Sequence, residues 1–241
     1  MPRAGSSRCP SKRCAAPWPR RGTRSLRGRP AAGVSVTLTA VVTGGSGGIG
    51  SQVVRELRAR RWEVVSLSRR EGCDVSDEAQ VVAAFSRLIS LDALINCAAV
   101  LVKQPLREMS SADWDIQLES GLRGAFLCSR EAFKLMRGRG GSIVMVSSLS
   151  GVAGAEKFPG MAGYVAAKSG LAGLTEVLAV EGRTDRIRVN AISPGAVETP
   201  MLQIAGVEGP SLKPEDVARV IVWLASEESA PLTGANLRMD P

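Results

Sequence analysis

The sequence contains no histidine in its 241 residues. This absence excludes Ser-His-Asp hydrolysis, His-ligated zinc proteases and any acid–base catalysis by imidazole. The five cysteines form no CxxC pair and are odd in number, which indicates neither a disulfide framework nor a zinc site. We therefore expect a reducing compartment and no metal centre, with any catalysis carried out by Tyr, Lys, Ser, Asp or Glu.

Long apolar runs and aromatic residues are also scarce. No run approaches the ~18 residues that cross a bilayer, so no membrane association is expected. Acidic residues are missing from the first part of the chain, where residues 1–30 hold nine of the 31 basic residues and the first acid is Glu56. The rest of the chain is nearly neutral, and aromatic residues do not alternate with the basic ones as they do in single-strand binders, so no nucleic-acid partner is expected.

This basic N-terminal segment is rich in Arg, Ser, Ala and Pro, a composition similar to that of an organelle transit peptide. It is equally compatible with an unstructured extension or with a start codon placed too early. We expect residues 1–35 to be a disordered extension or a transit peptide and residues 36–241 to form one domain. The location is then an organelle, plastid or mitochondrion, or else the cytoplasm.

Short β-branched runs alternate with amphipathic stretches from Thr37 onward. This alternation predicts an α/β fold with a doubly wound parallel sheet, Rossmann-like and in a single domain. We expect strands at 37–43, 62–67, 91–96, 142–147 and 187–193, and helices at 49–61, 111–136, 161–181 and 214–226.

A glycine-rich turn, TGGSGGIG at 43–50, follows the first predicted strand and opens the first predicted helix. Gly45, Gly47 and Gly50 match the GxGxxG pattern, in which the bare backbone and the helix N-terminus accept a dinucleotide pyrophosphate. Taken alone, the motif also fits a merely tight strand–helix turn.

The second predicted strand ends in VVSLSRRE. Ser68 stands where NAD binders place an acid for the ribose 2′-OH, and Arg69 and Arg70 follow it, as suits a 2′-phosphate. The pattern favours NADP(H) over NAD(H). The alternative is a solvated charged corner in which Glu71 partly neutralises the arginines.

The sequence YVAAK places Tyr164, the only tyrosine, four residues before Lys168 and hence on the same helix face. A neighbouring ammonium favours phenolate, so we predict that Lys168 lowers the pKa of Tyr164 and suits it to proton transfer. A strand ending in Ser147 and Ser148 precedes the pair.

Residues 37–240 resemble the short-chain dehydrogenase/reductase family in its single-domain form, and in particular its 3-oxoacyl-thioester reductases. The resemblance is carried, in order, by TGGSGGIG, INCAA at 95–99 where the family has NNAG, SSLSG at 147–151, YVAAK, RVNAISPG at 188–195 and VETPM at 197–201. It implies an NADP(H)-dependent oxidoreductase that interconverts a carbonyl and an alcohol, and a homodimer or homotetramer formed through the helices at 111–136 and 161–181.

The resemblance also implies roles for individual residues. Ser148 would hydrogen-bond the substrate oxygen, Tyr164 would transfer the proton, and Lys168 would hold the nicotinamide ribose. Adding the 2′-phosphate candidates, the expected cofactor-binding set is Gly44, Ser46, Gly48, Ile49, Gly50, Ser68, Arg69, Arg70, Asp74, Val75, Asn96, Ala98, Tyr164, Lys168, Pro194, Gly195, Val197 and Thr199. The expected pocket lining is apolar and comprises Val100, Leu101, Leu149, Val152, Phe158, Met161, Met201 and Leu202.

The sequence departs from the family pattern at several points. Gly121 occupies the position of an Asn that relays protons to the lysine, so we expect a functional but slower enzyme. Compared with the family, a sheet-covering helix is missing after the second predicted strand, and the segment 199–214 is short for the family's lid. Residues 154–160 are an insertion, and the chain ends in RMDP. The missing Asn keeps a second hypothesis open, a catalytically weakened NADP(H)-binding sensor or scaffold.

Overall fold

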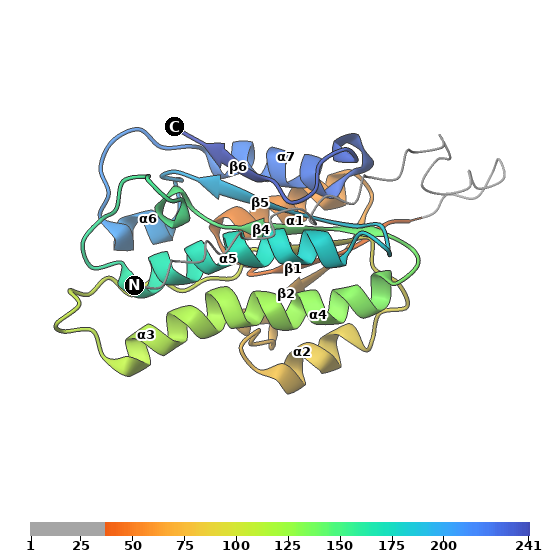
Figure 1. Ribbon diagram of the computed structural model, residues 1–241, viewed down its shortest axis with the longest axis horizontal. Coiled ribbons are helices and arrows are strands. Elements are labelled where there is room, and N and C mark those ends of the chain that lie inside the picture. Colours follow the sequence, from red (N-terminus) through yellow and green to blue (C-terminus); the bar gives the residue numbers. More distant parts are fainter. Residues whose placement is uncertain (1–36) are drawn as a thin grey trace, which may run out of the picture. The chain divides into compact units, whose positions relative to one another are not determined.

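The computed structural model describes residues 37–241, which form a parallel sheet covered by helices on both faces (Figure 1). The expected extension at 1–35 lies outside the described residues, and so does residue 36. The 6-stranded sheet has the order β2-β1-β3-β4-β5-β6, and all of its neighbouring strands pair in parallel. Its strands are β1 (Thr39–Thr43), β2 (Glu63–Leu67), β3 (Ala93–Asn96), β4 (Gly141–Val146), β5 (Ile187–Pro194) and β6 (Asn236–Met239). The predicted doubly wound sheet is confirmed.

Consecutive residues of a strand point to opposite faces of the sheet. Both sets are apolar because helices cover both faces. Val41 packs with one core cluster and Val42 with the other. The first cluster lies under α2 (Glu78–Phe85), α4 (Gly124–Met136) and α5 (Ala162–Glu181), and the second lies under α1 (Gly48–Ala59) and α7 (Pro214–Ala225). This double burial holds the strand ends, and the side chains that follow them, in fixed positions.

The long helix predicted at 111–136 is present, with a change of winding in its middle. It begins as α3 (Ser111–Leu118), where the Ser110 hydroxyl accepts a hydrogen bond from the backbone of Asp113, passes through a π-helical turn at Glu119–Arg123, and continues as α4. Gly121 lies buried in the π-helical turn. Such turns recur at functional sites, and this one lies beside α5.

The segment after β2 is short, as expected. A 3₁₀ turn at Arg69–Glu71 and the eight-residue α2 are the only helical elements between β2 and β3 among the described residues. β2 is therefore an edge strand, whereas the common order of this fold type has a further strand outside the second. The short α6 (Pro200–Ala205), α2 and β6 were not predicted.

Candidate active site

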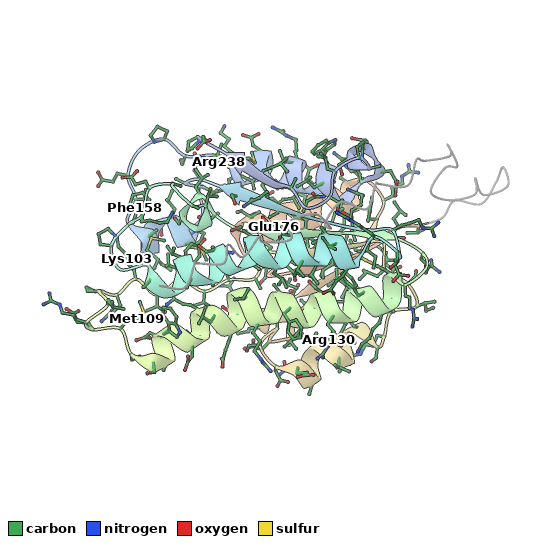
Figure 2. All side chains as sticks on the ribbon, in the orientation of Figure 1. Lys103, Met109, Arg130, Phe158, Glu176 and Arg238 are labelled. Atoms are coloured by element: carbon green, nitrogen blue, oxygen red, sulfur yellow. The ribbon has the colours of Figure 1, made fainter. Side chains whose placement is uncertain are left out.

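A cavity of about 570 Å³ lies where the segments after β4 and β5 meet α5 and α6. In Figure 2, Phe158 and Lys103 lie toward the α6 end of the view. Six of the eight expected lining residues are there, namely Leu101, Leu149, Phe158, Met161, Met201 and Leu202. Val100 and Val152 do not line the cavity. Of the adjacent pair Val100 and Leu101, only Leu101 lines the cavity, and beyond the turn at Leu149–Gly151 the wall continues with Gly154 and Ala155.

The glycine-rich turn is held against the ends of other strands by contacts that only glycine allows. Gly44 has φ +66°, and a Cβ on it would lie 2.9 Å from the Cα of Ala98 after β3. A Cβ on Gly48 would lie 2.4 Å from Thr199 Cγ2. The N-terminus of α1 has no side-chain cap, so no side chain occupies the backbone N–H groups of Gly48 and Ile49. This bare cradle fits the pyrophosphate of a dinucleotide.

Six of the 18 residues predicted to bind the cofactor line the cavity, Tyr164 among them. Those that share the cavity with Ser148 and Tyr164 are Ile49, Pro194, Gly195, Val197 and Thr199. Ser68 is buried at the end of β2, whereas Arg69 and Arg70 are exposed, and neither guanidinium has an ion pair or hydrogen bond within residues 37–241.

Asn96, Asp74 and Val75 are among the twelve predicted cofactor residues that do not line the cavity. The Asn96 side chain is directed toward α4, where its Nδ2 donates to Ser129 Oγ at 3.1 Å, and its buried Oδ1 has no partner in the described part of the chain. Asp74 accepts hydrogen bonds from Ser76 in the loop before α2, and Val75 is buried in the core. Their contacts with a cofactor stay predictions.

The three predicted catalytic residues come together. Tyr164 and Lys168 lie one turn apart on α5, and Ser148, which follows β4, lines the same cavity as Tyr164. The Lys168 Nζ lies 5.5 Å from the centre of the Tyr164 ring and donates to the Val146 carbonyl at 2.7 Å. The sequence motifs assigned no role to Ser147. Its hydroxyl donates to the Lys168 carbonyl at 2.8 Å and so links α5 to the end of β4.

The predicted lowering of the Tyr164 pKa is wrong. Burial raises the pKa of Tyr164 to about 12, although the Ser148 side chain acts to lower it. Burial also lowers the pKa of Lys168 to about 8. The reason is geometric: the ammonium lies over the face of the ring and donates to a backbone carbonyl, in surroundings that disfavour either charge.

Cys97 is a site residue that the sequence reasoning did not single out. Burial raises the pKa of its thiol to about 11, while the nearby Lys168 and a hydrogen bond from the Gly50 backbone act to lower it. The thiol therefore lies between the glycine-rich turn and the catalytic lysine. A signal was present, because Cys97 is the third residue of INCAA and stands where the family motif NNAG has its second Asn.

Within residues 37–241 no three His, Cys, Asp or Glu side chains are placed to hold a metal ion. Over the same residues, no helix has the length and apolar character needed to span a membrane.

Comparison with known proteins decides the family. Residues 51–241 match the family model described as enoyl-(acyl carrier protein) reductase. The chain belongs to the short-chain dehydrogenase/reductase family.

The chain is 36% identical to trans-4-hydroxycyclohexanecarboxylate dehydrogenase of Sinomonas cyclohexanicum over 69% of this chain and 67% of that one. It is 31% identical to 3-oxoacyl-[acyl-carrier-protein] reductase of Rickettsia bellii over 84% of this chain and 95% of that one. The structure of ElxO with NADP bound superposes with a TM-score of 0.77 at 28% identity, over 85% and 98% of the two chains. As a member of this family the protein is an oxidoreductase.

Proposed function

We propose that this protein interconverts a carbonyl and an alcohol with NADP(H) as the hydride carrier. The observation that carries the proposal is that Ser148 and Tyr164 line one largely apolar cavity beside the glycine-rich turn, with the Lys168 Nζ 5.5 Å from the Tyr164 ring centre. When bound, the nicotinamide supplies or accepts the hydride. The relatives support a substrate with a keto group on an acyl chain or a ring, because one is named as a 3-oxoacyl reductase and another as a cyclohexanecarboxylate dehydrogenase.

The chain's own residues handle the substrate oxygen and its proton. In reduction, Ser148 donates a hydrogen bond to the carbonyl oxygen and stabilises the negative charge that grows on it. Tyr164, whose raised pKa keeps it protonated at neutral pH, donates its proton to that oxygen. Lys168 would hold the cofactor ribose. In oxidation the proton returns to Tyr164.

Removing the Tyr164 hydroxyl tests this assignment. We expect Tyr164→Phe to lower NADPH consumption with 3-oxoacyl thioesters or cyclic ketones about 100-fold or more, because the proton donor is lost. NADPH binding, measured by calorimetry, should stay near that of the unchanged protein. Turnover that survives in Tyr164→Phe would contradict the proposal.

The missing relay Asn at Gly121 favours one second candidate, an NADP(H)-binding sensor or scaffold with weakened catalysis. Tight NADPH binding without reduction of any 3-oxoacyl thioester or cyclic ketone would support that candidate instead.

We also propose that the protein is a homo-oligomer. An exposed apolar groove lies between α5 and the continuous helix formed by α3, the π-helical turn and α4, and supports this assembly. It is lined by Leu118, Leu122, Phe126 and Leu174, with Glu119 and Arg123 beside them. Contiguous exposed apolar surface of this kind is typical of protein interfaces.

A further inference from the structure

The carboxylate of Glu71 is tied to the end of β2. Its Oε2 accepts hydrogen bonds from Ser66 Oγ at 2.7 Å and from Ser68 Oγ at 2.5 Å. The 3₁₀ turn at Arg69–Glu71 makes this possible by folding back toward the strand, and Gly72 ends the turn with φ +81°. Two serine hydroxyls thus converge on one anionic oxygen.

This anion lies next to the glycine-rich turn. Ser66 Oγ stands so close to Gly45 that a Cβ on that glycine would lie 2.1 Å from it. The end of the second strand beside this turn is where dinucleotide-binding folds recognise the 2′ group of the adenosine ribose. The Glu71 carboxylate therefore occupies the place where that group is expected.

The arginines of the same turn do not neutralise Glu71. Arg69 and Arg70 are exposed and form no ion pair with it. The alternative in which Glu71 partly neutralises the two arginines is therefore not found in the structure. The corner holds two unpaired guanidinium groups, two hydroxyl donors and a carboxylate that already uses both donors. A phosphate would gain the same donors and both cations, but only after the carboxylate has moved away.

We propose that Glu71 sets the choice between NADPH and NADH by competing with the 2′-phosphate for Ser66 and Ser68. This inference rests on the proposed cofactor binding. With NADH the carboxylate stays in place and accepts a hydrogen bond from the 2′-OH. With NADPH it must swing out, because two anions repel each other at one set of donors. Discrimination in favour of NADPH is therefore weaker than Arg69 and Arg70 alone would give.

The test is the binding of both cofactors to the full chain by calorimetry, for the unchanged protein and for Glu71→Gln. Glutamine keeps the shape of glutamate and one acceptor oxygen but removes the charge. We expect NADPH affinity to rise about tenfold, while NADH affinity is unchanged or falls. Glu63→Gln is the matched control, because it removes an exposed carboxylate at the other end of β2 and should leave both affinities unchanged.

Binding of 2′,5′-ADP and of 5′-AMP gives a second readout that needs no nicotinamide site and no catalysis. The 2′,5′-ADP should follow NADPH in Glu71→Gln, and 5′-AMP should follow NADH. An unchanged ratio of the two affinities in Glu71→Gln, with NADPH still bound, overturns the role of Glu71 but not the proposed function. Failure of the unchanged protein to bind either dinucleotide overturns both.

Discussion

Lys168 carries its charge in the protein interior without a counter-ion. Its side chain is buried, its Nζ donates to the Val146 carbonyl, and no carboxylate within residues 37–241 forms an ion pair with it. Burial of an unpaired ammonium favours the neutral amine, which is why its pKa falls to about 8. The positive charge that should hold the cofactor is thus maintained only at neutral and acidic pH.

We expect NADPH affinity to fall as the pH rises through about 8. Below this pH the free protein has a charged Lys168, which favours the anionic cofactor; above it the charge is lost, at a cost in affinity of up to about tenfold per pH unit. Calorimetric titrations from about pH 7 to about pH 9.5 measure the trend. The trend should disappear in Lys168→Met, which carries no charge at any pH. A flat profile in the unchanged protein would contradict this account.

Residue spacing predicted which catalytic groups meet but not how their protons behave. The i, i+4 spacing places Tyr164 and Lys168 on one helix face whatever surrounds the helix. Their pKa values depend on burial by β4 and neighbouring segments, which are distant in the sequence. The same limit applies to Glu71, because only the folded turn shows that the two serines bind it.

At the scale of elements, the hydrophobic pattern predicted the five strands from β1 to β5 and the long helices, because buried parallel strands and amphipathic helices leave strong periodic signals. Helix α2 was missed although Asp77 accepts hydrogen bonds from the backbone of Ala79 and Gln80, a capping pattern that the sequence contains. α6 and β6 are too short to leave a periodic signal, and their positions depend on the rest of the fold.

The π-helical turn gives the prediction for Gly121 a structural basis. A Cβ at this position would lie 3.3 Å from the Cβ of Ala167, the residue before Lys168, so any larger side chain crowds α5 slightly. An Asn at this position would add an amide beside Ala167, one residue from Lys168, where the family pattern has its relay group. We expect Gly121→Asn to raise kcat about threefold or more relative to Gly121→Ala, as measured by NADPH consumption.

Gly121→Ala is the matched control, because it introduces the same crowding against Ala167 without the amide. Both variants should retain the fold, which thermal unfolding monitored by circular dichroism checks. If Gly121→Asn is no faster than Gly121→Ala while both are folded, the missing amide does not limit turnover.

At the scale of the whole molecule, one helical face remains partly uncovered. α4 and α5 run side by side over the sheet (Figure 1), and the side chains of Phe126, Val177 and Val180 are exposed by 46%, 49% and 55%. In a two-fold dimer this patch would meet the same patch of the second copy. The groove is therefore suited to a second copy of this chain.

A charge placed in this groove should separate the copies. We expect the unchanged protein to have at least twice the monomer mass by light scattering after gel filtration, and Phe126→Glu to shift toward the monomer, because burying a carboxylate against Leu122 and Leu174 is unfavourable. Ile89→Glu is the control, since Ile89 is 99% exposed outside the groove and its substitution should leave the mass unchanged. A monomeric unchanged protein would show that the groove binds no second copy, and an oligomer that withstands Phe126→Glu would place the contact on another surface.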